Sequence, residues 1–396
     1  MDTQRSGMPA TNAGSAAEDW SSRESKEKDH DPLALHNAPT GSVSHHEDVG
    51  QSLSRTDSVK TSSHVQKTRG NLGLHPEAPI IEEHDTDLDH TDWWWPKVRM
   101  TLKEPFAEFF GVFIMVLFGD GSVAQVLLTE SGTTATSAPG GTGFGNYQSI
   151  NWGWGLGIML GIYVAGDSGA YLNPAVTLTN CVLRKLPWRR LPIYMLAQFL
   201  GGFIAAGVIY GNYINVINAY EGYGLRTVPP IKTSTGQIFC TYPASDLTQT
   251  SQVMDQFVAS AILMFVIFAL KDDSNKGTFS ASGAWFPLGL FFLIFGIGCA
   301  FGWQTGYAIN LARDFGPRLM SYAVGYQGVW SAGSGYWWVP TFVPFFGCLF
   351  GGILYDVFIF TGPSPINRPW FGLVDLMSPR TAVRERVREQ RREGIV

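Results

Sequence analysis

Charged residues are scarce in this chain of 396 residues: Asp, Glu, Lys and Arg make up 15%, against about 25% in an average protein. All eight His residues lie within the first 96 positions, so the remainder has no imidazole to bind a metal or to relay protons. The four Cys residues show no disulfide framework. These absences disfavour a metal site, a cofactor site and a catalytic centre, and we predict that the protein is not an enzyme.

The N-terminal segment, residues 1–96, has few large apolar residues with which to build a core. It holds 17 Asp or Glu against 8 Lys or Arg, so it carries about −9 while the rest of the chain carries about +4. It has no basic-then-apolar start of the kind found in signal peptides. Because such a segment cannot offset its ordering entropy, we predict a disordered, solvated tail over 1–96. The alternative is a regulatory domain that carries specific phosphorylation sites.

Apolar sequence is what the chain has in abundance after residue 97. Six near-continuous apolar stretches of about 20 residues occur, and such a length crosses roughly 30 Å of hydrocarbon as a helix. The stretches cover about 106–128, 149–164, 191–210, 254–270, 284–303 and 337–358. We therefore predict an all-α integral membrane protein with six transmembrane helices and a lipid bilayer as its surroundings. Nothing in the sequence indicates a nucleic-acid partner.

The placement of Lys and Arg indicates how the chain is oriented. The loop after the first stretch, about 129–148, has neither residue, whereas the segment before that stretch and the loop over 184–190 are basic. By the positive-inside rule both termini are cytoplasmic. Residues 361–396 then form a cytoplasmic C-terminal tail, whose Arg-rich end is either a solvated helix or a contact with anionic lipid.

One short pattern occurs twice, as Ser168-Gly-Ala-Tyr-Leu-Asn-Pro-Ala-Val176 and as Thr305-Gly-Tyr-Ala-Ile-Asn-Leu-Ala-Arg-Asp314. Each copy is a glycine turn, an Asn and a short helical run between two apolar stretches. A helix of about eleven residues from Asn173 rises roughly 16 Å, which is half of a bilayer. We predict two half-helices that enter from opposite faces and meet at the midplane, in an inverted repeat of about 103–210 and 252–358. Backbone of this kind is tolerated in lipid only when it is buried or lines a watery path, so the pattern indicates a pore.

These two loops resemble the paired signature loops of the major intrinsic protein family, the aquaporins and aquaglyceroporins. The resemblance covers about residues 103–360 and implies a channel domain over 97–360, with six transmembrane helices plus two re-entrant half-helices. It further implies a homotetramer in the plasma membrane, with one pore per subunit. Like fungal glycerol channels, such a protein passes glycerol, other small polyols and some water. Two rival functions are a gradient-coupled secondary transporter and a closed-pore junction or scaffold protein.

The midplane of the predicted pore is formed by the first helical turns of the two half-helices. The six residues concerned are Asn173, Pro174, Ala175, Asn310, Leu311 and Ala312. Each Asn is predicted to cap its half-helix through the side-chain oxygen and to present amide donors to a passing solute, the alternative being a pair of plain helix caps. Leu311 departs from the second Pro of the family pattern, and Tyr171 stands where the family usually has His.

The resemblance assigns the narrowest point of the pore to four positions, which are Trp154, Gly298, Tyr307 and Arg313. An Arg guanidinium can hydrogen-bond two adjacent hydroxyls, while Trp and Tyr rings provide an apolar corner for the CH side of a polyol. Water-selective relatives typically have His at the position of Gly298, so the Gly is expected to leave room for a carbon skeleton. The alternative is that Trp154 and Gly298 are ordinary helix residues.

Three carboxylates are predicted to brace the re-entrant loops. Glu108 in the first stretch corresponds to Asp255 in the fourth, where Asp is a shorter substitute for the Glu that the family has at both positions. Each carboxylate could accept hydrogen bonds from the backbone N–H groups of the neighbouring loop. Asp314 is expected to fix the second loop. The alternative for the first two, a proton relay, is disfavoured because the apolar stretches contain no His or Lys to continue it.

Overall fold

The computed structural model describes residues 63–75, 93–129, 143–277, 285–368 and 388, all within the compact unit Ser58–Val396. These residues form helices and loops without a strand, so the predicted all-α class is confirmed. The six long helices are α3 (Lys103–Thr129), α4 (Tyr147–Ala165), α6 (Arg190–Glu221), α7 (Gln249–Leu270), α8 (Phe286–Thr305) and α11 (Trp338–Phe358). Shorter helices are α1 (Ser63–Asn71), α2 (Trp94–Thr101), α5 (Pro174–Leu183), α9 (Leu311–Ala323) and α10 (Ala332–Gly335).

Five of the described helices are long and apolar enough to cross a membrane, namely α3, α6, α7, α8 and the run formed by α10 and α11. The sixth predicted span, α4, lies outside that set because its first half carries Gln148 and Asn151 among Gly and Trp residues. Helix α6 continues eleven residues past the predicted end at Tyr210. The hydropathy falls there, yet no Pro interrupts the helix before Gly222, whose φ of 108° ends it.

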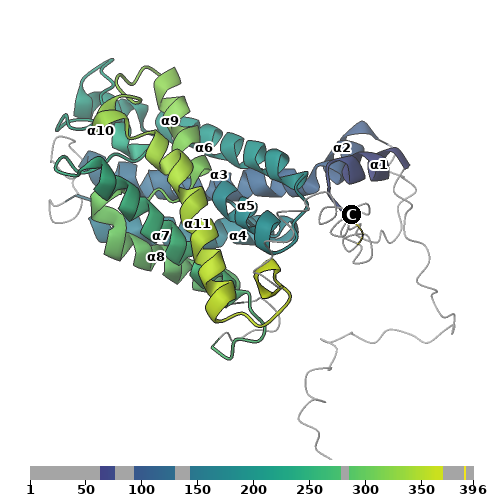
Figure 1. Ribbon diagram of the computed structural model, residues 1–396. Coiled ribbons are helices and arrows are strands. Elements are labelled where there is room, and N and C mark those ends of the chain that lie inside the picture. Colours follow the sequence, from purple (N-terminus) through teal and green to yellow (C-terminus); the bar gives the residue numbers. More distant parts are fainter. Residues whose placement is uncertain (1–62, 76–92, 130–142, 278–284, 369–387, 389–396) are drawn as a thin grey trace, which may run out of the picture. The chain divides into compact units, whose positions relative to one another are not determined.

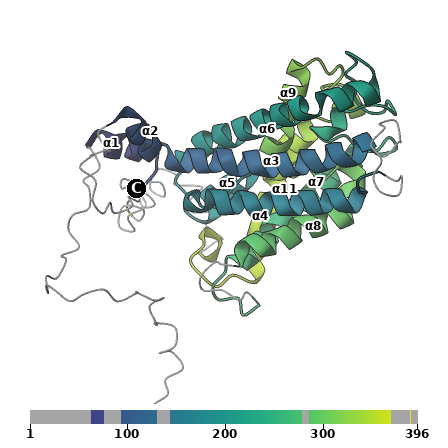
Figure 2. The same ribbon diagram turned by 180° about the vertical axis from the view of Figure 1, so that it is seen from behind.

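The packing of the helices follows the inverted repeat. In the first half α3 packs between α4 and α6, and in the second half α7 packs between α8 and α11 (Figures 1 and 2). The two half-helices pack across the repeats, since α5 lies against α11 and α9 lies against α6. Each half of the chain therefore completes the core of the other.

Close helix contacts occur at equivalent glycines in the two repeats. A Cβ added at Gly201 of α6 would overlap the carbonyl oxygen of Phe109 in α3. In the second repeat, a Cβ at Gly347 of α11 would overlap the carbonyl oxygen of Phe257 in α7. Small residues let backbones approach in this way where helices pack without large side chains between them.

The half-helices run from the middle of the bundle to its two ends. We call the end at which α5 terminates the near end; there Arg184 donates to the carboxylate of Asp356 in α11 at 2.8 and 2.6 Å. We call the end at which α9 terminates the far end; there the N–H of Gln327, just after α9, donates to the Arg226 carbonyl in the loop between α6 and α7 at 3.1 Å.

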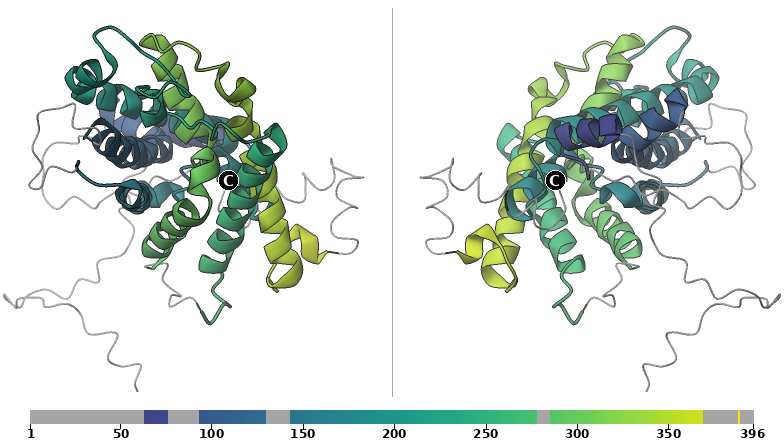
Figure 3. Two further views of the ribbon diagram at one scale, coloured as in Figure 1. Left: turned by 90° about the vertical axis from the view of Figure 1, so that its left-hand side faces the viewer. Right: turned by 90° about the vertical axis from the view of Figure 1, so that its right-hand side faces the viewer.

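Helix α1 packs at the near end, which the right-hand view of Figure 3 faces. Arg69 of α1 is fully buried and forms an ion pair with Glu104 at the start of α3, with an Nη2 to Oε1 distance of 2.5 Å. Arg69 also donates to the carbonyls of Met100 and His75. Residues 63–71 form a helix where a disordered tail was predicted, because Arg69 in this polar segment pairs with the buried carboxylate of Glu104. The remaining tail residues, apart from 72–75, 93–96, 361–368 and 388, lie outside the described residues.

This ion pair leads to a prediction about stability. Arg69→Ala removes the cation from the buried carboxylate of Glu104, and breaking a buried pair by removing one partner costs about 3–5 kcal/mol. We expect a clearly lower thermal unfolding temperature for Arg69→Ala in detergent. The matched control is Lys67→Ala on the exposed side of the same helix, which should unfold like the parent protein. Equal unfolding temperatures for the two variants would show that the ion pair between Arg69 and Glu104 does not stabilise the fold.

Candidate functional site

The two loops that precede the half-helices share one unusual backbone conformation. Positive φ angles occur at the fourth, third and first residues before each Asn. They are Gly169 (98°), Ala170 (50°) and Leu172 (51°) in the first loop, and Gly306 (72°), Tyr307 (37°) and Ile309 (44°) in the second. A residue other than Gly in this region costs of order 1–3 kcal/mol and persists only where its surroundings enforce it. The residues that hold these loops are therefore part of the site.

Glu108 of α3 holds the first loop. Its carboxylate is fully buried and accepts from the backbone N–H groups of Tyr171 and Leu172, at 2.9 and 2.8 Å. It also accepts from the Ser168 hydroxyl at 2.5 Å and from the Gln198 amide at 2.7 Å. Four donors on one carboxylate offset the cost of its burial.

Gln256 of α7 holds the second loop in the corresponding way. Its side-chain oxygen accepts from the N–H of Ile309 at 2.9 Å, just as Glu108 accepts from Leu172 in the first loop. The neighbouring Asp255 accepts only from the side chains of Thr305 and Gln304 at the end of α8. Sequence reasoning missed Gln256. The signal was present, because Glu108-Phe109 in the first repeat aligns with Gln256-Phe257 in the second.

Asp314 fixes the first turn of the second half-helix to the loop between α6 and α7. It accepts from the N–H and the hydroxyl of Thr241, at 2.8 and 2.6 Å, and from the guanidinium of Arg318. Arg318 is itself fully buried and donates to the carbonyls of Thr241 and Val329. The same loop supplies the Phe239 carbonyl, which accepts from the Arg313 guanidinium at 3.2 Å. Asp314 thus holds the loop that contacts Arg313, and in this indirect way it helps to position the Arg313 side chain.

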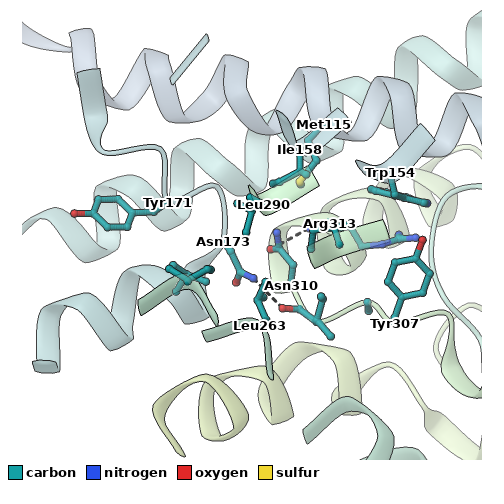
Figure 4. A pocket seen from close by; sticks show the side chains of 15 residues that line it. Met115, Trp154, Ile158, Tyr171, Asn173, Leu263, Leu290, Tyr307, Asn310 and Arg313 are labelled. Carbon is teal, nitrogen blue, oxygen red and sulfur yellow. Dashed lines mark hydrogen bonds between the residues drawn. The ribbon is translucent and has the colours of Figure 1, made fainter. Parts of the chain in front are cut away.

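Asn173 and Asn310 meet in the middle of the bundle. Each caps its own half-helix by accepting, at 2.9 Å, from the N–H of the residue two positions on. Each also donates its amide across the repeat: Asn173 to the Ile309 carbonyl and Asn310 to the Leu172 carbonyl, both at 2.8 Å. An amide has two N–H donors, and both Asn side chains line a cavity (Figure 4). The positive ends of two helix dipoles meet at the same place.

The start of each half-helix is the same with and without Pro. Pro174 occupies the first position of α5, and Leu311 occupies the first position of α9. The Asn cap distance is 2.9 Å in both cases. Ala175 and Ala312 follow and are fully buried against the bundle. The departure at Leu311 therefore leaves this cap bond unchanged, and Asn310 accepts in addition from the N–H of Arg313 at 3.4 Å.

The cavity extends from the Asn pair in two directions and is open to solvent; its empty space, with the open part included, amounts to about 510 Å³. Trp154, Tyr307 and Arg313 lie together at one end of it, and Tyr171 lies at the other end (Figure 4). The Arg313 guanidinium carbon is 4.1 Å from the centre of the Trp154 ring. The walls are otherwise apolar, and include Met115, Ile158, Val176, Leu263, Ile267, Leu290 and Ile294. The cavity thus combines one cation, two amides and aromatic faces in an apolar surround.

Gly298 differs from the other three residues predicted for the narrow point, because it is not among the residues that line the cavity. A Cβ added there would overlap the side-chain oxygen of Asn151 and would lie 2.9 Å from the phenol carbon of Tyr307. The room that Gly298 leaves is therefore occupied by Tyr307 and Asn151. Gly298 was expected to leave space for a solute's carbon skeleton. In the structure that space holds part of the Tyr307 ring, and the ring forms the wall of the cavity on that side.

Comparisons with known proteins agree with this architecture. Residues 95–355 match the model of the family described as major intrinsic protein. The chain is 54% identical to Aquaglyceroporin-9 of Botryotinia fuckeliana, over 86% of this chain and 75% of that protein. It is 52% identical to Probable aquaglyceroporin-2 of Gibberella zeae, over 84% of this chain and 93% of that protein. The X-ray structure of the aquaglyceroporin from Plasmodium falciparum is similar with a TM-score of 0.55 and 26% identity, over 65% of this chain and 96% of that one.

Proposed function

Because the chain belongs to the major intrinsic protein family, we propose that it is a passive channel through which glycerol and other small neutral solutes, with some water, cross a membrane down their gradients. The observation that carries this proposal is the cavity between the half-helices, with Arg313 and two aromatic rings at one end and the Asn pair in the middle. The family consists of channels, which agrees with the prediction that the chain is not an enzyme.

The constriction at Trp154, Tyr307 and Arg313 suits a small polyol. The guanidinium of Arg313 has five donors in a fixed plane, of which one is held by the Phe239 carbonyl. The remaining donors can bind two adjacent hydroxyls of one solute molecule. The rings of Trp154 and Tyr307 face the CH side of the same molecule, and this side is dehydrated at the constriction. The fixed positive charge repels cations.

The Asn pair acts on whatever passes the middle of the membrane. A solute oxygen or a water held between Asn173 and Asn310 accepts hydrogen bonds from both sides. The same molecule lies between two positive helix ends, so the waters around it cannot form one chain with a single orientation. A proton therefore cannot pass along the waters at this point. The cavity thus lets neutral solutes through while protons are held back.

Passive flow is favoured over coupled transport by the composition of the cavity wall. Among the described residues that line it, no Asp, Glu, His or Lys occurs. A transporter driven by protons or sodium ions needs such groups, or exposed carbonyl cages, at its substrate site. Among these described lining residues, Arg313 alone has a charged side chain, which donates to a backbone carbonyl.

The protein is integral to a membrane, and its setting can be proposed in more detail. We infer a channel domain over 97–360 between two cytoplasmic tails, because the near end carries Lys103, Arg184 and Lys271. We further propose that the membrane is the plasma membrane. Apolar side chains also face outward from the bundle; on α6 they are Leu196, Leu200, Ile204 and Val208, which repeat every four residues. Such a stripe suits lipid or the neighbouring subunit of a homotetramer.

The test is stopped-flow light scattering on proteoliposomes that contain the purified chain. We expect glycerol and water to cross faster than in empty vesicles, with a glycerol rate that rises in proportion to its gradient. A rate that saturates and depends on an ion gradient would identify a secondary transporter instead. Fluxes equal to those of empty vesicles, from folded protein, would favour a junction or scaffold protein.

A further inference from the structure

The hydroxyl of Tyr307 points away from the cavity that its ring lines. It donates to the side-chain oxygen of Asn151 at 3.2 Å. Asn151 lies one turn before Trp154 on α4 and is 1% exposed. Its amide nitrogen donates to the Cys299 sulfur on α8 at 3.5 Å, which fixes the oxygen toward Tyr307. Asn151 is not among the residues that line the cavity.

We propose that Asn151 is a positioning residue of the constriction and sets the preference for glycerol over water. By accepting the Tyr307 hydroxyl behind the wall, it presents the ring face to the solute and keeps the polar tip out of the path. This inference rests on the proposed function, since it concerns the selectivity of the same cavity.

The physical reason lies in the two ends of a tyrosine side chain. A buried phenol hydroxyl without an acceptor is costly, so a Tyr307 that lost Asn151 would turn its hydroxyl toward the nearest water. In a conducting channel that water would be in the cavity, which the Tyr307 ring lines. A ring moved that way takes up width that a carbon skeleton needs and competes with a polyol for Arg313. Water is narrower and makes its own hydrogen bonds, so it is less affected.

Gly298 makes this arrangement possible. The Asn151 oxygen and the Tyr307 ring both occupy the space in which a side chain at that position would lie. The helices α4 and α8 pack against each other at this level. Asn151, Gly298 and Tyr307 thus form one unit in which the glycine provides space and the amide provides the acceptor.

The experiment is a double-mutant cycle read as the ratio of glycerol to water permeability in proteoliposomes. Asn151→Leu has nearly the shape of the native residue but no acceptor, and it should lower the ratio about fivefold or more. The same change made in a Tyr307→Phe background should leave the ratio of that background unchanged, because no hydroxyl remains to be held. Asn151→Asp, which keeps an acceptor in place, should retain most of the native ratio.

The same cycle distinguishes a positioning role of Asn151 from a packing role. If Asn151 only filled space, the Leu variant, which has nearly the same shape, would keep the native ratio, and that outcome would overturn the proposal. An equal fall of the ratio in both backgrounds would also overturn it, because the effect would then not depend on the Tyr307 hydroxyl. If Asn151→Leu does not fold, Asn151→Ser takes its place with the same expectations, because its shorter side chain does not reach Tyr307. Absence of glycerol flux through the unmodified protein would instead reject the proposed function.

Discussion

Gly298→Ala is expected to lower glycerol permeability about tenfold or more, whereas Gly296→Ala on the same helix should leave it unchanged. The added methyl at Gly298 would overlap the Asn151 oxygen and crowd the Tyr307 ring, so that the ring is displaced toward the cavity. A tenfold change corresponds to about 1.4 kcal/mol of barrier, which a shift of one ring wall can supply. At Gly296 a Cβ meets nothing within 4 Å.

The measurement is glycerol and water flux in proteoliposomes together with thermal unfolding in detergent. Ala in place of a helical Gly should stabilise the Gly296 variant by about 0.5–1 kcal/mol, and the Gly298 variant should lack this gain. Water flux through the Gly298 variant should fall less than glycerol flux, because water needs less width. A Gly298→Ala protein with native glycerol flux would mean that the Tyr307 ring is not a wall of the path.

Glu108→Gln should destabilise the fold by about 3 kcal/mol or more, although Gln256 does the corresponding task in the second repeat. The Glu108 carboxylate accepts from four donors, two of them backbone N–H groups on its two oxygens. A Gln has one acceptor oxygen, so one buried N–H would face an amide donor instead. Gln256 accepts from only one backbone N–H, that of Ile309, which explains why an amide suffices there.

The control for this prediction is another acidic residue at the near end. Asp167 pairs with Lys103 at 2.6 Å, but its side chain is 62% exposed, so Asp167→Asn should cost at most about 1 kcal/mol. Both variants are compared by thermal unfolding in the same detergent, and by glycerol flux where they fold. If Glu108→Gln unfolds at the same temperature as Asp167→Asn, the positive φ angles of the first loop must be held by other contacts.

The parts of the site that follow from short stretches of sequence were predictable. The cap of each half-helix depends on an Asn and the two residues after it, so both caps follow from the repeated pattern. Arg313 lies within the first turn after Asn310, and Trp154, Tyr307 and Arg313 are brought to one end of the cavity as the resemblance implied.

The parts that depend on contacts between distant segments were not predictable. The hydrogen bond from Tyr307 to Asn151 joins residues 156 positions apart, and a polar residue in an apolar stretch gives no sign of its partner. For the same reason Gly298 was interpreted as open space, because the sequence cannot show which side chain fills it. Arg69 was assigned to a disordered tail because composition averages over a segment and does not detect one buried ion pair.

The crossed amide bonds at the midplane also constrain how the chain is made. The carbonyl that accepts from Asn173 belongs to Ile309, which is 136 residues later. At synthesis rates of about 5–20 residues per second, the first half-helix waits roughly 7–27 seconds before its partner exists. During that interval the membrane contains a half-built protein whose re-entrant segment is held to the first three spans by hydrogen bonds with Glu108, Tyr194 and Gln198. Ribosome pausing after the first repeat would lengthen that interval and expose the nascent chain to quality control.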